Sequence, residues 1–249
     1  MLPKVSADTL SWTNARNALN LQQFYAVGGR RSRGAQWRAV QNPYVPLRHW
    51  QRVFCFTWSA FQDFDAVYRE NSSLVHWSVF LPQRLRAVLP DNYSSVGEEL
   101  FILFLPNSRR ATRLRIETVT GQSPQDQQQL FVHLLNLVND VPESHWQTIA
   151  TFHTLALKDP RFWGYVAYYN GDAVGALGAF RTGNTVGLYS GFTVPEWRGR
   201  GLSLDFADEV VRSLHNKGFH VICQCRPDLE RFYAKVSAIV TARWGRWDL

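Results

Sequence analysis

Residues 193–203, TVPEWRGRGLS, restrict the possible folds of this chain more than any other stretch. They join an apolar run with strand character, residues 186–194, to an amphipathic helical run, residues 202–217. A helix that begins directly after a strand and a short loop presents N–H groups without acceptors and a partial positive charge. Gly199 and Gly201 remove the Cβ atoms that would keep an anion from the backbone. We therefore expect a main-chain site for a phosphate or pyrophosphate here.

The same stretch resembles the acetyl-CoA loop of the GCN5-related N-acetyltransferases (GNAT), whose signature is Gln/Arg-x-x-Gly-x-Gly/Ala. This chain has Ser at the last position, where Gly or Ala is usual, and a Val-Pro-Glu-aromatic lead-in similar to that of the family. The resemblance implies that the main chain of Phe192 and Val194 binds the pantetheine arm of acetyl-CoA. It implies that the pyrophosphate is bound by Arg198, Gly199, Arg200, Gly201, Leu202 and Ser203.

A second stretch, LERFYAKVSA at residues 229–238, resembles the family pattern A-x-x-L-Y-x-K-x-G-F. Tyr233 and Lys235 match the pattern, a Ser-Ala pair replaces Gly-Phe, and Arg226 stands where Asn is usual. By resemblance, Tyr233 is the general acid that protonates the departing CoA thiolate, because a phenol with an ordinary pKa near 10 is protonated at neutral pH. The alternative is a tyrosine that only packs against its neighbours.

The acceptor amine must be neutral to attack the thioester, so a base has to take its proton. Asp140, Glu143 and Asp159 lie in the region that borders the acceptor site in this family, and each also fits a surface charge. His145 and His153 could share a helix face, but two histidines do not complete a metal site. We expect no metal.

Hydrophobic periodicity predicts the elements of residues 113–249. Their order, β-α-α-β-β-β-α-β-α-β, is that of the GNAT fold, so the resemblance implies an α+β fold with a mixed sheet. The first of the helices begins with Ser123 as N-cap and Pro124 as its first residue. Strands are expected over residues 114–119, 162–169, 173–180, 186–194, 219–225 and 239–247, and helices over 124–138, 143–157, 202–217 and 228–236.

A polar stretch, residues 106–112, separates this block from residues 1–112, which predict a smaller α+β domain. The first block contains no phosphate loop. It is faintly similar to a degenerate N-terminal copy of the GNAT fold, and an unrelated α+β domain is the alternative. Strands are expected near residues 50–58, 74–81 and 99–105, and helices near 61–69 and 83–88.

The net charge of +7 is concentrated in the first block, where residues 1–112 hold 13 Lys and Arg against 7 Asp and Glu. Such an excess attracts nucleic acid or an acidic partner, whereas the simpler interpretation is a solvated loop. The basic side chains in question are Arg30, Arg31, Arg33 and Arg38.

The chain has no run of eighteen apolar residues and no leader-like N-terminus, so we expect a cytoplasmic protein without a membrane span. Its three cysteines, Cys55, Cys223 and Cys225, are expected to be core thiols. A dinucleotide-binding fingerprint fails, because Leu204 occupies the place of its third glycine. We expect transfer of an acetyl group from acetyl-CoA to a primary amine. The alternatives are a CoA-binding regulator without turnover and an enzyme acting on an amine carried by RNA, such as an aminoacyl-tRNA.

Overall fold

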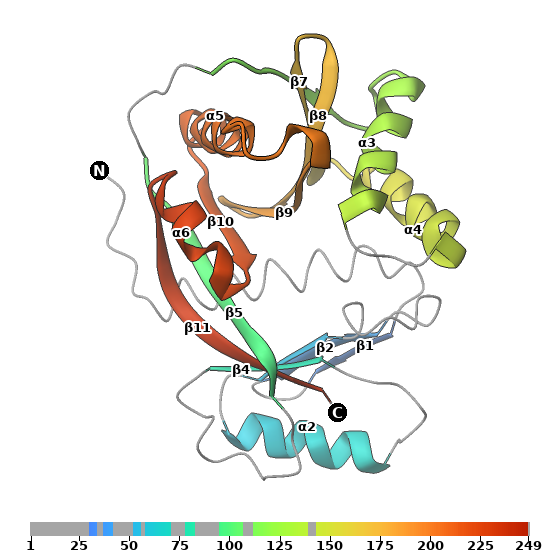
Figure 1. Ribbon diagram of the computed structural model, residues 1–249. Coiled ribbons are helices and arrows are strands. Elements are labelled where there is room, and N and C mark those ends of the chain that lie inside the picture. Colours follow the sequence, from blue (N-terminus) through green and yellow to red (C-terminus); the bar gives the residue numbers. More distant parts are fainter. Residues whose placement is uncertain are drawn as a thin grey trace. The chain divides into compact units, whose positions relative to one another are not determined.

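The computed structural model describes residues 30–33, 37–41, 52–55, 58–70, 78–82, 95–106, 112–138 and 143–248 (Figure 1). The chain divides into two compact units. The first comprises Met1–Phe101, Cys225–Asp228 and Val240–Leu249, and the second comprises Ile102–Gln224 and Leu229–Ile239. Two long strands, β5 (Ser95–Phe104) and β11 (Ala238–Asp248), contribute to both units.

The second unit contains a sheet with the strand order β5-β10-β9-β8-β7-β6. The pairs β6–β7, β7–β8 and β8–β9 are antiparallel, whereas β9 and β10 are parallel. Helices α3 and α4 lie on one side of these strands and α5 on the other (Figure 1). The elements are β6 (Arg115–Val119), α3 (Gln125–Val138), α4 (Glu143–Ala156), β7 (Phe162–Tyr169), β8 (Asp172–Thr182), β9 (Thr185–Thr193), the 3-10 turn η3 (Pro195–Trp197), α5 (Leu202–Asn216), β10 (His220–Cys225), the 3-10 turn η4 (Pro227–Leu229) and α6 (Glu230–Ala234).

Local sequence explains the antiparallel part of this sheet. Asn170 and Gly171 have φ values of 53° and 95°, the left-handed pair that a tight hairpin between β7 and β8 requires. Further along β7, the missing side chain of Gly164 leaves room for the ring of Phe131 from α3, since a Cβ at this position would lie 2.4 Å from that ring. The close approach of α3 to the sheet thus depends on one glycine.

The first unit contains the strand order β1-β2-β3-β4-β11, with β3 and β4 parallel and the other pairs antiparallel. Its core includes four aromatic rings. Phe80 stacks on Phe54 at 4.7 Å between ring centroids, and Trp244 of β11 stacks on Phe101 at 5.0 Å. The remaining elements are β1 (Arg30–Arg33), β2 (Trp37–Gln41), β3 (Arg52–Cys55), α2 (Trp58–Glu70) and β4 (Ser78–Pro82).

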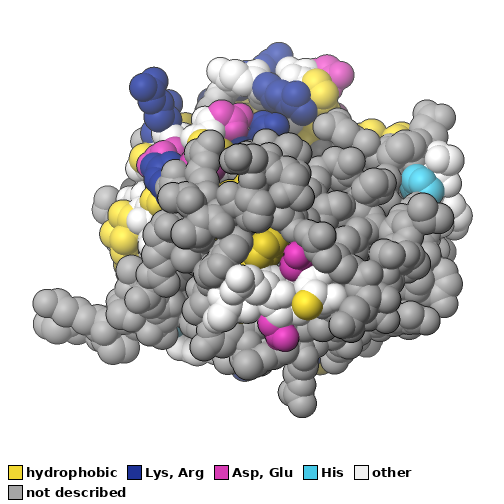
Figure 2. Space-filling model, turned by 90° about the horizontal axis from the view of Figure 1, so that it is seen from below, with side chains coloured by type: hydrophobic (Ala, Val, Ile, Leu, Met, Phe, Trp, Pro, Cys, Tyr) yellow, Lys and Arg dark blue, Asp and Glu magenta, His cyan; other side chains and the backbone are white. Residues whose placement is uncertain are grey.

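Helix α2 is amphipathic over its described side chains. Ala60, Phe61 and Phe64 are buried, while Gln62 and Asp63 are exposed. The described surface of this helix shows acidic side chains and white atoms, with a few hydrophobic atoms among them (Figure 2). This is the pattern of a helix with one face on the core.

The element order predicted for residues 113–249 is confirmed, and most boundaries lie within two residues of the expected ones. One local detail is wrong: the Ser123 hydroxyl accepts a hydrogen bond from the N–H of Thr120 at 3.0 Å and so faces back from the helix. The expected helix 61–69 is found as α2, and the expected helix 83–88 lies outside the described residues. All three cysteines are buried and free, as predicted.

The basic residues of the first block correct one expectation. Arg30, Arg31 and Arg33 lie in β1 and Arg38 lies in β2, and Arg33 pairs with Arg38 across the hairpin. They therefore belong to a strand pair and not to a loop. The last ten residues also group with this unit, because Trp244 and the neighbouring residues of β11 pair with β4. The division into domains 1–112 and 113–249 stays a prediction about folding units.

Candidate functional site

Strand β9 separates from β10 half-way along its length. The parallel pairing runs from Thr185 with His220 to Leu188 with Cys223, and β9 continues for five residues beyond it. Ser190 has a φ of 53°, and the register with β8 shifts at this point, which marks a β-bulge. The second half of β9 lies beyond this pairing, and the two strands diverge here (Figure 1). We call the space between them the opening, and its β9 side leads directly to the 193–203 stretch.

The β8–β9 ladder determines which main-chain groups of β9 face this opening. The N–H of Val194 donates to the carbonyl of Val174 at 3.0 Å, so Val194 and, two residues earlier, Phe192 point their polar groups toward β8. The N–H of Val194 is therefore engaged within the sheet. Binding of the pantetheine arm by the main chain of Phe192 and Val194 stays a prediction. The main chain of Thr193, which alternates with these two residues, points away from β8.

The anion loop, residues Arg198–Ser203, lies between η3 and α5. Gly199 and Gly201 have φ values of 76° and 79°, a region that other L-residues rarely adopt. Gly201 is the N-cap of α5 and provides no side-chain cap, and its carbonyl accepts the N–H groups of Leu204 and Asp205. Within the described part of the chain, no N–H from Gly199 to Ser203 has an acceptor. Consecutive N–H groups at a helix N-terminus form a binding site for an anion.

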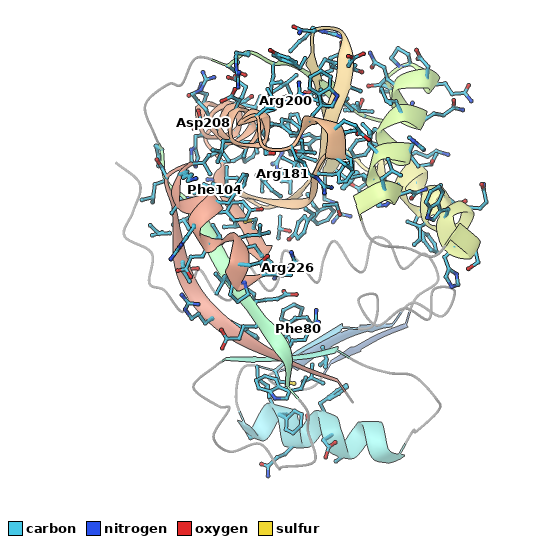
Figure 3. All side chains as sticks on the ribbon, viewed as in Figure 1. Phe80, Phe104, Arg181, Arg200, Asp208 and Arg226 are labelled. Carbon is cyan, nitrogen blue, oxygen red and sulfur yellow. The ribbon has the colours of Figure 1, made fainter. Side chains whose placement is uncertain are left out.

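The two arginines of the anion loop are held by aromatic rings of neighbouring turns. Arg198 donates from Nε to the carbonyl of Thr193 at 3.0 Å, and its guanidinium lies 5.5 Å from the centre of the Phe192 ring. Arg200, at the start of α5 in Figure 3, lies 4.7 Å over the ring of Trp197. Both side chains are exposed, so they add positive charge around the N–H groups of the anion loop without covering them.

The serine that departs from the family signature has a structural partner. Ser203 Oγ lies 2.7 Å from Thr193 Oγ1, and both residues are half-buried. This hydrogen bond joins the end of β9 to the first turn of α5. A Gly or Ala at position 203 would lack this hydrogen bond. The serine therefore fixes the end of β9 relative to the first turn of α5.

Tyr233 lies on α6, the short helix after β10. Its ring meets Phe104 edge-on at 5.7 Å and its neighbour Phe232 at 5.1 Å, and Figure 3 places Phe104 near this helix. The side chain is half-buried. Because α6 follows the strand that diverges from β9, the tyrosine is on the β10 side of the opening. Arg226, in the position where the family has Asn, forms an exposed ion pair with Asp228 at 3.0 Å.

The candidates for the general base are not brought together. Asp140 and the side chain of Glu143 lie outside the described residues. Asp159 accepts hydrogen bonds from Arg161, with 2.6 Å between Oδ2 and Nη2, and these hold the pKa of its carboxyl below the usual range. His153 is buried in α4 and His145 is half-buried. Within the described ranges, no group of three or more metal-ligating side chains occurs.

Asp159 also lines a pocket of about 530 Å³. The pocket is at the end of the sheet where β7 begins, which is the end opposite the anion loop, because Phe162 aligns with Phe180 and Phe180 with Gly187 near the start of β9. Apart from Asp159, it contains none of the predicted site residues. Its lining residues are Thr118, Thr120, Gly121, Gln122, Leu157, Lys158, Asp159, Pro160, Phe162, Trp163, Lys217 and Phe219.

Comparison with known proteins agrees with this geometry. The model of the acetyltransferase (GNAT) family matches residues 131–237, which include the diverging strand, the anion loop and Tyr233. Residues 131–237 are therefore a domain of the GNAT superfamily. No curated protein matches the chain by sequence. None of the helices within the described residues has the length and apolar character needed to cross a membrane.

Solved structures show that the GNAT fold extends over most of the chain. A GCN5-related N-acetyltransferase from Kribbella flavida superimposes with a TM-score of 0.65 at 12% identity, over 94% of each chain. A GCN5-related N-acetyltransferase from Sphaerobacter thermophilus gives 0.62 at 15% identity, over 87% of this chain and 81% of that one. A protein of unknown function from Staphylococcus epidermidis gives 0.63 at 13% identity, over 89% and 94%. At such identities the likeness concerns the fold.

Two residues of the site were not predicted from the sequence. Thr193 joins the anion loop through its carbonyl and its hydroxyl, and the signature does not include it. Arg113, from the segment before β6, donates a hydrogen bond to the carbonyl of Arg200 in the anion loop. The Ser in place of Gly or Ala was a signal for the first contact. The sequence contains no signal for the second contact, because it joins residues far apart along the chain.

Proposed function

We propose that this protein transfers the acetyl group of acetyl-CoA to a primary amine, with the anion loop binding the CoA pyrophosphate. The observation that carries this proposal is the row of N–H groups from Gly199 to Ser203, at the end of a strand that has separated from its neighbour. A pyrophosphate accepts hydrogen bonds from such a row, and the helix dipole favours its charge. The pantetheine arm would then extend along the opening between β9 and β10, toward which the main-chain N–H of Thr193 points.

In the proposed reaction, the neutral amine attacks the thioester carbonyl carbon, and the C–S bond breaks as the tetrahedral intermediate collapses. The amine nitrogen loses one proton to a base, and the CoA sulfur gains one from Tyr233. Tyr233 is the proposed acid because it lies on the helix after β10, on the other side of the opening from the anion loop. A positioned acid of this kind contributes about 10²- to 10⁴-fold in rate.

The test combines an amine screen with one conservative substitution. Release of the CoA thiol is followed with a panel of amines that includes small amines, amino sugars, peptide N-termini and lysine side chains. With an amine that reacts, we expect Tyr233→Phe to lower kcat by about 10²-fold while the Kd for acetyl-CoA is unchanged. Tyr168→Phe is the matched control, because Tyr168 is on β7, its ring lies against Arg115 of β6, and it is outside the proposed site.

The outcomes separate the alternatives. Acetyl-CoA binding without turnover on any amine would favour a CoA-binding regulator. Full activity of the Tyr233→Phe variant would remove Tyr233 from the mechanism and leave it as a packing residue between Phe104 and α6.

A further inference from the structure

We propose that Arg113 is a positioning residue that shapes the anion loop and neutralises a carboxylate beside it. This inference rests on the proposed binding of acetyl-CoA. It concerns a residue that lies outside the span 131–237 matched by the family model and outside the loop signature itself.

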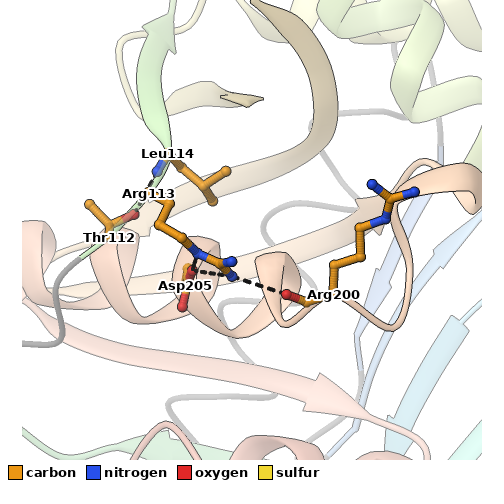
Figure 4. Close-up of polar contacts among 5 residues, drawn as sticks. All are labelled: Thr112, Arg113, Leu114, Arg200 and Asp205. Carbon is orange, nitrogen blue, oxygen red and sulfur yellow. Dashed lines mark hydrogen bonds and ion pairs between the residues drawn. The ribbon is translucent and has the colours of Figure 1, made fainter. Parts of the chain in front are cut away.

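One guanidinium connects three parts of the site (Figure 4). Arg113 Nη2 donates to the carbonyl of Arg200 at 3.0 Å, and Nε and Nη2 each lie 3.2 Å from Asp205 Oδ2. The same Nη2 lies 3.6 Å from the position that a Cβ of Gly201 would occupy. The guanidinium is therefore in direct contact with the loop carbonyl, the N-cap residue and the first turn of α5.

The backbone around Arg113 is itself anchored. Leu114 is buried, and its N–H donates to Thr112 Oγ1 at 3.1 Å, which closes a tight turn just before β6. The guanidinium also lies 5.9 Å from the centre of the Tyr169 ring at the end of β7. These contacts all come from the protein itself, and a side chain fixed by its own neighbours can hold a loop in one shape.

Electrostatics gives Arg113 a second effect. Asp205 lies in the first turn of α5, and its side chain is only 14% exposed. A carboxylate in the first turn stabilises the helix, but it also repels an anion that approaches the same N–H groups. The ion pair with Arg113 cancels that charge. The other charged side chains nearby are engaged elsewhere or solvated: Arg198 and Arg200 face aromatic rings, and Glu196 is exposed.

If Arg113 and Asp205 formed only an ordinary surface ion pair, removing Arg113 would leave the binding of acetyl-CoA unchanged. Arg113 is 54% exposed, and exposed ion pairs contribute little to stability. What distinguishes this pair is the bond to the Arg200 carbonyl and the nearly buried position of Asp205. Loss of Arg113 should therefore be felt in anion binding more than in folding.

The experiment measures the Kd for acetyl-CoA and for S-acetyl-pantetheine, which lacks the pyrophosphate, by titration calorimetry. We expect Arg113→Ala to weaken acetyl-CoA binding about tenfold and to leave S-acetyl-pantetheine binding unchanged. Adding Asp205→Asn to Arg113→Ala should recover more than half of the loss on a logarithmic scale, because it removes the carboxylate that Arg113 no longer neutralises. Arg113→Lys, which keeps the charge but not the two-pronged contact, should be intermediate.

Arg115→Ala is the matched control, because Arg115 pairs with Glu117 and Tyr168 on β6 and β7. An Arg113→Ala variant that binds acetyl-CoA as tightly as the wild type would overturn the inference. So would an equal loss for both ligands, or no recovery with Asp205→Asn. A wild-type protein that does not bind acetyl-CoA would instead overturn the proposed function, so the two failures are distinguishable. Thermal melting of each variant verifies that it is folded.

Discussion

The imidazole of His153 should make this protein sensitive to acid. It is 2% exposed, and burial lowers its pKa from 6.5 to about 4. The unfolded chain therefore takes up a proton as the pH falls below about 6.5, whereas the folded protein does so only near pH 4. The free energy of unfolding is therefore highest above pH 6.5, where the imidazole is neutral in both states, and it falls as the pH falls toward 4.

The size of the effect follows from the shift. A pKa difference of one unit corresponds to about 1.4 kcal/mol, so the whole window corresponds to about 3 kcal/mol and the step from pH 7.5 to pH 5 to about 2 kcal/mol. His215 acts in the same direction, since burial also lowers its pKa. This loss is a large part of the stability of an ordinary domain.

Urea unfolding at pH 7.5 and pH 5 measures the free energy of unfolding in each condition. We expect the wild type to lose at least about 2 kcal/mol, and His153→Leu to lose about 2 kcal/mol less than the wild type over the same interval. His133→Leu is the control, because His133 is on the exposed side of α3. Equal pH dependence of the wild type and His153→Leu would refute the reasoning from burial.

Two further predictions concern the sheet and the basic strand. Gly164→Ala should destabilise the protein by about 1–3 kcal/mol, because the new Cβ would lie 2.4 Å from the ring of Phe131. Gly178→Ala, with its nearest contact at 3.3 Å, should be milder in the same urea series, and the reverse order would contradict the packing argument. If the acceptor amine is carried by RNA, reversal of the three arginines of β1 to Glu should abolish RNA binding at low salt, measured by a mobility shift. Unchanged binding would exclude that acceptor class.

The features that could be predicted from sequence are local ones. The hairpin at Asn170 and Gly171 needs two residues that accept positive φ, and such residues are visible in the sequence. The anion loop is likewise contained in a few consecutive residues, so its position between β9 and α5 was correctly predicted.

The features that were missed depend on residues distant in sequence. The alternation of the β8–β9 ladder, which engages Val194 and leaves Thr193 facing the opening, follows from a bulge at Ser190 that no periodicity reveals. Arg113 reaches the loop only because β6 and α5 meet in space. The pairing of β11 with β4 depends on Trp244 filling the aromatic core of the first unit.

The central claim is that the anion loop binds the pyrophosphate of acetyl-CoA. Titration calorimetry of the wild type and Gly201→Glu with acetyl-CoA tests it most directly. Gly183→Glu is the control, because Gly183 also has a positive φ but lies in the β8–β9 turn at the other end of the sheet. We expect the wild type and Gly183→Glu to bind, and Gly201→Glu to lose binding, because the new carboxylate and the strained N-cap oppose an anion. Equal binding by Gly201→Glu, or no binding by the wild type, would contradict the account.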